Sequence, residues 1–348
     1  MPELIVTNFN RNFTGVSATA AGVVRQQAGR YDMALCGVAL PGCPAPITRR
    51  QAVQASRTAP PDRPFTIWHV RRNTEMRAAL WARDVLRLPI RIVFTSAAIR
   101  RHSAFPRWLI SRMDAVIATT ELAASFVPHV RAVVPHGVDC DRFTPAADRA
   151  AAFAATGLPG KRAIATIGRI RPEKGSDRFV DAMLRLLPDH PDVTALLIGR
   201  AARSDQAFLD GLKAKITAAG LSERILFPGE IAPDALPPLM QALSAVVQLP
   251  RYEGYGMAPL EGMASGVPFV ATDQGYYRSF SGQGRAGTIV PDDDASATTA
   301  ALSQLLSDPA RHTAMAAAAR ASAQTHFSIE AEADGIATVY DRLWAAGR

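Results

Sequence analysis

The sequence predicts an α/β protein of two domains, each built on a parallel sheet with helices on both faces. The 348 residues exceed one ordinary core and suit two domains of roughly 150–180 residues. Short apolar runs typical of buried strands alternate with helical segments in both halves, which is the pattern of doubly wound sheets. The 48% hydrophobic content is typical of a soluble globular protein, and no apolar run approaches the roughly 18–20 residues of a membrane span.

The expected strands are short and apolar. In the first half they cover 4–7, 32–38, 65–69, 89–95, 114–119 and 130–135, and in the second half 163–167, 193–199, 225–230, 245–249, 269–271 and 287–291. The main helices are expected over 18–27, 74–86, 99–113, 148–158, 176–187, 208–219, 234–242, 295–306, 309–325 and 329–343, with a further one beginning near Pro259. The N-terminus has no basic region before an apolar core, so it does not predict a signal peptide.

The charge is concentrated in the first half. Residues 1–150 carry 20 Arg, no Lys and 10 acidic residues, a net charge of +10, whereas residues 151–348 carry −2. An anionic partner of the first half is one explanation, and an arginine-biased genome is the other. No nucleic-acid-binding pattern appears, so no nucleic-acid partner is expected. The odd number of cysteines without metal-ligand spacing, Cys36, Cys43 and Cys140, predicts free thiols in a reducing cytosol.

The stretch 245–272 carries the most specific chemistry. An expected strand ends at Pro250 and is followed by a loop with Glu253 and Gly256, then by a helix whose first turn would hold Glu261. A helix N-terminus behind a glycine loop suits a phosphate, and a carboxylate can accept hydrogen bonds from two vicinal hydroxyls of a ribose. The alternative for Glu261 is a carboxylate that only complements the helix dipole.

A second loop offers cations for the same phosphates. The strand over 163–167 is followed by Gly168 and Arg169, and Lys174 lies five residues further on, just before the next helix. Arg169 presents a planar fork to paired phosphate oxygens and Lys174 a compact point charge. Together they would neutralise a leaving diphosphate without a metal, so neither a metal nor another cofactor is expected. Two exposed surface cations are the competing explanation.

Glu253 and Glu261, eight positions apart, together with this loop resemble the signature of retaining, nucleotide-sugar-dependent glycosyltransferases of family 4, which have the GT-B fold of two facing Rossmann-like domains. The resemblance implies catalytic roles for Arg169, Lys174 and Glu253. The donor-binding residues that it implies are Gly15, Gly168, Arg169, Lys174, Glu253, Gly256, Met257 and Glu261.

The resemblance also implies the domain organisation. The segment from His136 to Asp139, with Phe143-Thr144-Pro145 after it, is similar to the stretch that closes the first domain in this family. The expected domains are therefore an acceptor domain over 1–150 and a donor domain over 151–328, and the last helix, 329–348, is expected to pack back on the first domain.

Three positions depart from the family pattern. This chain has Thr14-Gly15 where the family commonly has a pair of glycines, and His136 where it has an asparagine. It has Thr95 at the end of a strand where family members commonly carry a histidine near the sugar. His69 and His102 are the candidates to replace that histidine. The alternative for His69 is a polar residue at a domain cleft without a direct role, and the alternative for His102 is an ordinary surface residue.

A basic, aromatic segment lies in the first half. It predicts a helix that either rests on an anionic bilayer or grips an acidic acceptor, and an ordinary packed amphipathic helix is the alternative. The candidate acceptor-binding or membrane-binding residues are His69, Arg71, Arg72, Arg100, Arg101, Arg107 and Trp108.

The whole chain looks most like the lipopolysaccharide core mannosyltransferases of Gram-negative bacteria, and the runs that carry this resemblance are 65–76, 91–97, 107–120 and 133–143. That resemblance implies GDP-mannose as the donor, a Kdo-bearing lipid A precursor as the anionic glycolipid acceptor, and a cytoplasmic enzyme peripherally associated with the inner membrane. The alternatives are a UDP- or ADP-sugar donor with another acceptor, a nucleotide-sugar epimerase, which would need acid/base groups not evident in the sequence, and a non-catalytic module that binds nucleotide sugars or membranes.

Overall fold

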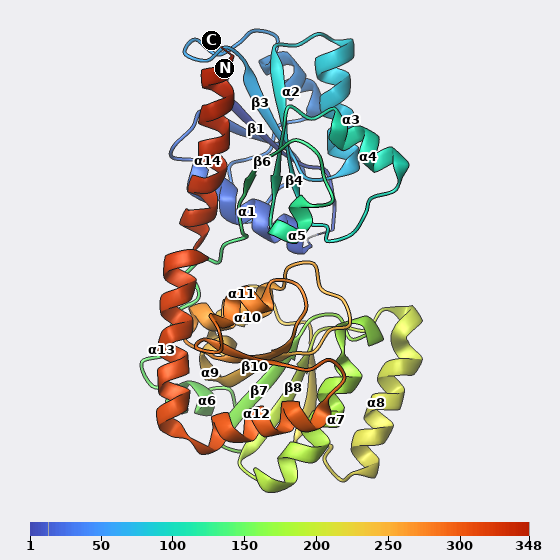
Figure 1. The fold of residues 1–348 in the computed structure, drawn as a ribbon, viewed down its shortest axis with the longest axis vertical. Coiled ribbons are helices and arrows are strands. Elements are labelled where there is room, and N and C mark those ends of the chain that lie inside the picture. Colours follow the sequence, from blue (N-terminus) through green and yellow to red (C-terminus); the bar gives the residue numbers. More distant parts are fainter. Residues whose placement is uncertain (13, 348) are drawn as a thin grey trace. The chain divides into compact units, whose positions relative to one another are not determined.

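The computed structural model describes residues 1–12 and 14–347, and the chain divides into two compact units (Figure 1). Unit 1 comprises Met1–Gly137 and Phe327–Arg348, and unit 2 comprises Val138–His326. The first division therefore falls at Gly137, before the segment Phe143-Thr144-Pro145 rather than after it as the sequence predicts.

Unit 1 is built on a six-stranded parallel sheet with the order β2-β1-β3-β4-β5-β6. Its strands are β1 (Leu4–Asn8), β2 (Met33–Gly37), β3 (Thr66–Val70), β4 (Ile90–Ser96), β5 (Ala115–Ala118) and β6 (Val130–Val133). Its helices are α1 (Gly15–Gln27), α2 (Arg49–Ala55), α3 (Asn73–Leu80) with the π-helical turn η1 (Trp81–Val85), α4 (Ala104–Ser111), α5 (Glu121–Ala124) and α14 (Ile329–Ala346).

Two hydrophobic clusters cover the two faces of this sheet. Val23 of α1 and Tyr340 of α14 pack on one face, and Met76 of α3 and Leu109 of α4 pack on the other. The helix α14 is joined to the sheet by the Trp344 indole, which donates a hydrogen bond to the carbonyl of Phe65 at 3.1 Å.

Unit 2 is built on a second six-stranded parallel sheet with the order β12-β11-β10-β7-β8-β9. Its strands are β7 (Arg162–Ile167), β8 (Val193–Ile198), β9 (Ile225–Gly229), β10 (Leu243–Gln248), β11 (Phe269–Thr272) and β12 (Gly287–Val290). Its α-helices are α6 (Arg149–Ala154), α7 (Ser176–Leu186), α8 (Gln206–Ala218), α9 (Leu236–Ala242), α10 (Met257–Ala264), α11 (Tyr277–Ser281), α12 (Ala295–Ser307) and α13 (Pro309–His326). Short 3₁₀ turns are η2 (Pro172–Lys174), η3 (Leu187–Asp189) and η4 (Arg203–Asp205).

Two local predictions are wrong. The helix expected over 99–113 is only α4, so Arg100 and Arg101 lie in the loop that precedes it. The helix expected from Pro259 begins two residues earlier, at Met257. The segment after β11 forms the short helix α11, for which the sequence analysis gives no prediction.

Two further observations bear on the sequence analysis. The three cysteines are free. Among residues 1–12 and 14–347, no helix combines the length and apolarity needed to cross a membrane.

Candidate functional site

Two loops of unit 2 meet at the carboxyl edge of its sheet, where β7 and β10 lie side by side. Gln248, at the end of β10, donates a hydrogen bond to the carbonyl of Ile167, at the end of β7, over 2.9 Å. Further out, the Arg251 guanidinium binds both carboxylate oxygens of Asp177 at 2.8 and 2.7 Å, and its backbone N–H donates to the carbonyl of Glu173 at 2.9 Å. These contacts hold the loop after β10 against the loop after β7.

Gly175 is required for this close approach. Its φ of +69° lies in the left-handed region, and a Cβ at this position would lie 1.9 Å from the carbonyl oxygen of Leu249. Only a residue without a Cβ fits there without moving the backbone. The glycine therefore sets where Lys174, the preceding residue, is presented.

The result is a direct ion pair between two of the predicted catalytic residues. The Lys174 ammonium lies 2.7 Å from the Glu253 carboxylate, and the two side chains are 24% and 18% exposed. The other Glu253 oxygen accepts the N–H of Gly254 at 2.9 Å, and the buried Tyr277 hydroxyl is hydrogen-bonded to Glu253. Glu253 is thus held from two sides beside a cation that remains open to solvent.

Arg169, unlike Lys174, is not held in an ion pair in the described part of the chain. It is exposed, and no hydrogen bond or ion pair to its guanidinium is found among the residues that the structure describes. A small hollow lies between this loop and the sheet, and its lining includes Gly168, Arg169, Lys174, Ser176 and Gln248. The structure therefore brings Arg169 and Lys174 to one hollow, with the arginine donors available to an anion.

The loop after β10 ends in a helix N-terminus. Gly256 precedes Met257, the first residue of α10, with a φ of +101°. A Cβ on Gly256 would lie 2.0 Å from the Tyr277 ring, so Tyr277 occupies the space that a side chain would need. The first amides of α10 have no intrahelical acceptor, and they follow the loop that holds Glu253.

Glu261 does not lie in the first turn of its helix, as the sequence predicts. Because α10 begins at Met257, Glu261 is its fifth residue and lies in the second turn. Its side chain is half-buried, and burial raises the pKa of its carboxyl to about 7, an effect that Arg142 partly opposes. No hydrogen bond to this carboxylate is found in the described part of the chain, so its oxygens are available to a ligand.

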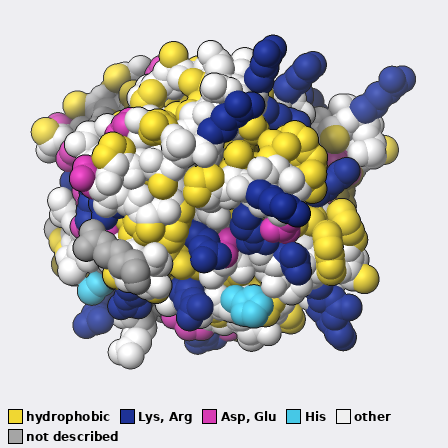
Figure 2. All heavy atoms as spheres, turned by 90° about the horizontal axis from the view of Figure 1, so that it is seen from above, with side chains coloured by type: hydrophobic (Ala, Val, Ile, Leu, Met, Phe, Trp, Pro, Cys, Tyr) yellow, Lys and Arg dark blue, Asp and Glu magenta, His cyan; other side chains and the backbone are white. Residues whose placement is uncertain are grey.

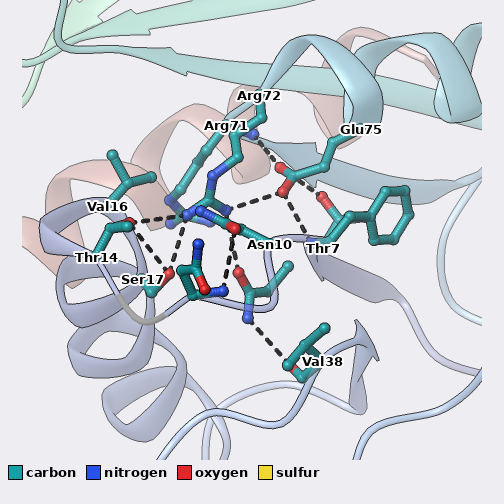
Figure 3. A network of polar contacts seen from close by, with 12 residues as sticks. Thr7, Asn10, Thr14, Val16, Ser17, Val38, Arg71, Arg72 and Glu75 are labelled. Atoms are coloured by element: carbon teal, nitrogen blue, oxygen red, sulfur yellow. Dashed lines mark hydrogen bonds and ion pairs between the residues drawn. The ribbon is translucent and has the colours of Figure 1, made fainter. Parts of the chain in front are cut away.

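In unit 1, Arg72 braces the loop that follows β1 (Figure 3). Its guanidinium donates to Asn8 and Glu75, both at 3.0 Å, and to Thr14 and Ser17 at 3.3 and 3.0 Å. These bonds fix the start of α1, whose first residue is the exposed Gly15. Arg72 is therefore committed to internal contacts, and Gly15 keeps its amide at a helix N-terminus.

His69 is a completely buried residue. One ring nitrogen contacts the Tyr340 hydroxyl and the other lies 2.7 Å from the Thr95 hydroxyl. Burial, with a smaller contribution from Arg71, holds the pKa of His69 well below its usual value. His69 thus bonds directly to Thr95, which stands where the family commonly has a histidine, and both of its ring nitrogens are engaged inside unit 1. His102 lies apart, partly buried in the loop before α4.

The basic, aromatic segment is exposed and continues onto a neighbouring element. Phe105 and Trp108 stack with ring centroids 6.1 Å apart. We call the exposed apolar side chains of η1 and α4, with the residue after η1, the aromatic surface. It comprises Trp81, Val85, Leu86, Phe105 and Trp108, which are between 37% and 64% exposed. Arg100, Arg101 and Arg107 are exposed beside it, and Figure 2 shows arginine and apolar side chains interspersed on one face of the molecule.

Sequence reasoning missed three residues that shape this site. Tyr277 fills the space beside Gly256 and bonds to Glu253, and Arg251 with Asp177 joins the two loops. The available signal for Tyr277 was the Gly275-Tyr276-Tyr277 run after β11. Nothing in the sequence pairs Arg251 with Asp177, which are 74 positions apart.

Comparison with known proteins shows to which family the chain belongs. The family described as glycosyl transferases group 1 matches residues 148–322. The lipopolysaccharide core biosynthesis mannosyltransferase LpcC of Rhizobium leguminosarum bv. viciae is 40% identical over 99% of this chain and 98% of its own length. LpsB of Rhizobium meliloti strain 1021, described in the same words, is 41% identical over 98% of this chain and 97% of its own length.

Two solved structures are similar to parts or all of the chain. Anabaena HepE, in complex with UDP, superposes with a TM-score of 0.82 over 97% of this chain and 99% of its own, at 18% identity, which shows a shared fold. The C-terminal domain of LpcC from Francisella tularensis, a group 1 glycosyl transferase, is 33% identical and covers 56% of this chain with a TM-score of 0.54. With a family match over half of the chain and relatives at 40% identity over nearly all of it, the chain belongs to the group 1 glycosyltransferases and has their two-sheet GT-B fold.

Proposed function

We propose that the protein transfers mannose from GDP-mannose to a hydroxyl of a lipopolysaccharide core or lipid A precursor, with retention at the anomeric carbon. The observation that carries this proposal is the Lys174–Glu253 pair, which lines one hollow with the exposed Arg169, in a chain 40–41% identical to two core mannosyltransferases.

The geometry supports a division of labour among these residues. Arg169 and Lys174 line one hollow, and in this proposal they stabilise the charge that develops on the leaving diphosphate. Electrostatic stabilisation of this kind is usually the largest single contribution to catalysis. Glu253 would hold the sugar, and Glu261 the ribose hydroxyls. The amides at Gly256 and Met257 would meet a phosphate or the sugar. The protein residues supply the stabilising charges, so the proposal needs no metal.

Thermal stabilisation by nucleotides tests the donor. A ligand that binds only the folded state raises the melting temperature by mass action. We expect GDP to raise Tm by several degrees at saturating concentration, and UDP and ADP at matched concentration to have little effect. A shift with UDP or ADP in place of GDP would overturn GDP-mannose as the donor. Transfer from labelled GDP-mannose to a Kdo-bearing lipid A precursor then tests the reaction itself.

Glu261 makes a prediction about pH. Its carboxyl has a pKa of about 7 in the free protein, and only the ionised form accepts hydrogen bonds from both ribose hydroxyls. The affinity for GDP is therefore expected to fall as pH drops below about 7, by at most about tenfold per pH unit, and to level off above it. Titration calorimetry from pH 5.5 to 8.5 measures this dependence.

The matched variant for that measurement is Glu261→Gln. GDP has a titrating phosphate of its own, so the informative quantity is the difference between wild type and variant. Because the pKa of the Glu261 carboxyl is higher in the folded state, this group stabilises the fold fully below about pH 4.5. The contribution is lost as the pH rises through about 7. The variant should therefore be at least as stable as wild type at pH 8 while binding GDP more weakly. Identical pH profiles for the two proteins would argue against the ribose contact.

The aromatic surface supports a second part of the proposal, which is peripheral attachment to the cytoplasmic face of the inner membrane. Exposed aromatic rings beside arginines suit an anionic bilayer surface, where the rings enter the interface and the cations meet lipid phosphates. A membrane-embedded acceptor would reach the enzyme at this surface.

Vesicle sedimentation tests this attachment. We expect binding to vesicles that contain anionic lipids, weakened by added salt, and reduced about tenfold or more in the double variant Phe105→Ser/Trp108→Ser. Leu122→Ser is the control, because Leu122 is 52% exposed on α5, outside the aromatic surface. Equal loss of binding in the control would show that general surface hydrophobicity, and not this surface, mediates attachment.

A further inference from the structure

Several buried polar atoms of unit 1 have no hydrogen-bond partner among the described residues, and three of these atoms follow one another along the edge of its sheet. They are Arg71 Nη1, Ser96 Oγ and Thr119 Oγ1, on side chains of which 9%, 2% and 0% is exposed. Arg71 follows β3, Ser96 ends β4 and Thr119 follows β5, and these strands are neighbours in the sheet. Buried polar groups are nearly always satisfied, and ligands bind parallel sheets at the carboxyl ends of the strands.

Strand alternation separates these three residues between the two faces of the sheet. Ile67 and Ile117 belong to the cluster that packs under α14, so Arg71 and Thr119, at even spacing from them, lie toward that face. Ile92 and Phe94 belong to the cluster under α3 and α4, so Ser96 lies toward the opposite face. Arg71 and Thr119 follow strands that are two positions apart in the sheet, so their backbones are separated by roughly 10 Å. The side chains that extend from these two positions could contact one sugar ring and its charged substituent.

The charge of Arg71 has no direct counter-ion. Glu75 accepts hydrogen bonds from Arg72, from the Thr7 hydroxyl and from the Phe9 and Arg71 backbone. No hydrogen bond or ion pair joins the Arg71 guanidinium to a carboxylate within the described ranges.

The other carboxylate near Arg71 is also engaged. Glu332, on α14, lies 2.8 Å from a ring nitrogen of His136 and accepts the Gly137 N–H at 2.8 Å. Burial lowers the pKa of Arg71, and the through-space effects of Tyr340, Glu332 and Glu75 oppose this only in part. A buried cation without a hydrogen-bonded partner is costly, so this position is suited to receive an anion.

We propose that Arg71 and Thr119 form the recognition site for an oxyanion-bearing acceptor sugar. The Arg71 guanidinium binds the oxyanion, a sugar-acid carboxylate or a sugar phosphate, and the Thr119 hydroxyl bonds to a hydroxyl or ring oxygen of the same sugar. This inference rests on the proposed function, because it names the part of the acceptor that unit 1 recognises. It also assigns Arg71 a role different from that of Arg72, whose donors are used internally.

Thr119→Val is the sharpest variant. It removes an unsatisfied hydroxyl and keeps the side-chain shape, so Tm should stay unchanged or rise. The KM for the acceptor should rise about tenfold, whereas the KM for GDP-mannose should not change. Ser96→Ala is the matched control, since it removes the orphaned hydroxyl on the opposite face and should leave both constants unchanged. A purely structural Thr119 would lower Tm and leave the acceptor KM unaltered, which would overturn the proposal.

Direct binding separates the two sources of the oxyanion. Thermal shift and titration are measured with free Kdo, with its carboxamide and with glucosamine 1-phosphate, in wild type, Arg71→Met and the exposed-arginine control Arg131→Met. Binding of Kdo but not of the carboxamide identifies a carboxylate, and binding of glucosamine 1-phosphate identifies a phosphate. Either affinity should fall about 10- to 100-fold in Arg71→Met and stay at the wild-type value in Arg131→Met.

Two outcomes would overturn this inference. One is the absence of binding by any probe to the wild type, and the other is equal binding by the wild type and Arg71→Met. A protein that is stabilised by GDP and transfers mannose, but shows either outcome, keeps the proposed function and loses only the acceptor site. A protein that binds Kdo through Arg71 but does not respond to GDP loses the donor assignment and keeps the oxyanion site.

Discussion

Replacing Lys174 with methionine is expected to lower the kcat for mannose transfer by about 10²- to 10³-fold, the usual cost of removing one preorganised stabiliser of developing charge. The Lys174 ammonium lies 2.7 Å from Glu253, so the variant removes both a charge for the diphosphate and the partner that orients Glu253. The side chain is partly exposed, and Glu253 keeps its contacts with Gly254 and Tyr277. Stability should therefore change by less than about 1 kcal/mol.

The measurement is steady-state transfer with varied GDP-mannose, together with a melting curve of each protein. Lys213→Met is the control, because Lys213 is an exposed cation on α8 and has no proposed role. Arg169→Met should behave like Lys174→Met in kcat without any change in the position of Glu253. If Lys174→Met retained more than about a third of the wild-type kcat, the electrostatic role proposed for Lys174 would be wrong.

Replacing Gly175 with alanine is expected to destabilise the fold strongly, by about 4 kcal/mol or more. Two costs add. The left-handed backbone conformation at φ +69° costs a residue with a Cβ about 1–2 kcal/mol. In addition, the Cβ would lie 1.9 Å from the Leu249 carbonyl oxygen, so the loop after β10 has to move. Because that loop carries Glu253, transfer activity should fall even where the variant remains folded.

Gly157→Ala separates these two costs. Gly157 has a nearly identical φ of +67°, and a Cβ there would meet nothing within 4 Å. This control should lose only about 1–2 kcal/mol, measured by urea unfolding, and keep its activity. Equal destabilisation of the two variants would show that the loop relaxes around the new methyl group, and that Gly175 does not position Lys174.

The periodicity of the chain was sufficient to predict both sheets, because buried parallel strands are short apolar runs that alternate with helices. It placed β1, β7 and α12 within a residue or two of their observed bounds. It failed where a local signal competed with packing. Pro259 suggested a helix start, but α10 begins at Met257 because Gly256 adopts a φ of +101° beside Tyr277, and the second glutamate therefore lies in the second turn.

The sequence by itself determined which residues make up the proposed donor site in unit 2. The glycines, the two cations and the two carboxylates follow the strands β7 and β10 directly, so local order alone predicts that they share one sheet edge. Tertiary structure decided which of them are paired and which are open. Lys174 meets Glu253 because Arg251 and Asp177, 74 positions apart, join their loops. Arg169 is exposed, and its guanidinium has no partner among the residues that the structure describes. In unit 1, His69 is bonded to Thr95 and Tyr340, while Arg71 retains an unsatisfied donor. Such pairings depend on distances between residues remote in the chain, and those distances arise only when the sheets and helices pack.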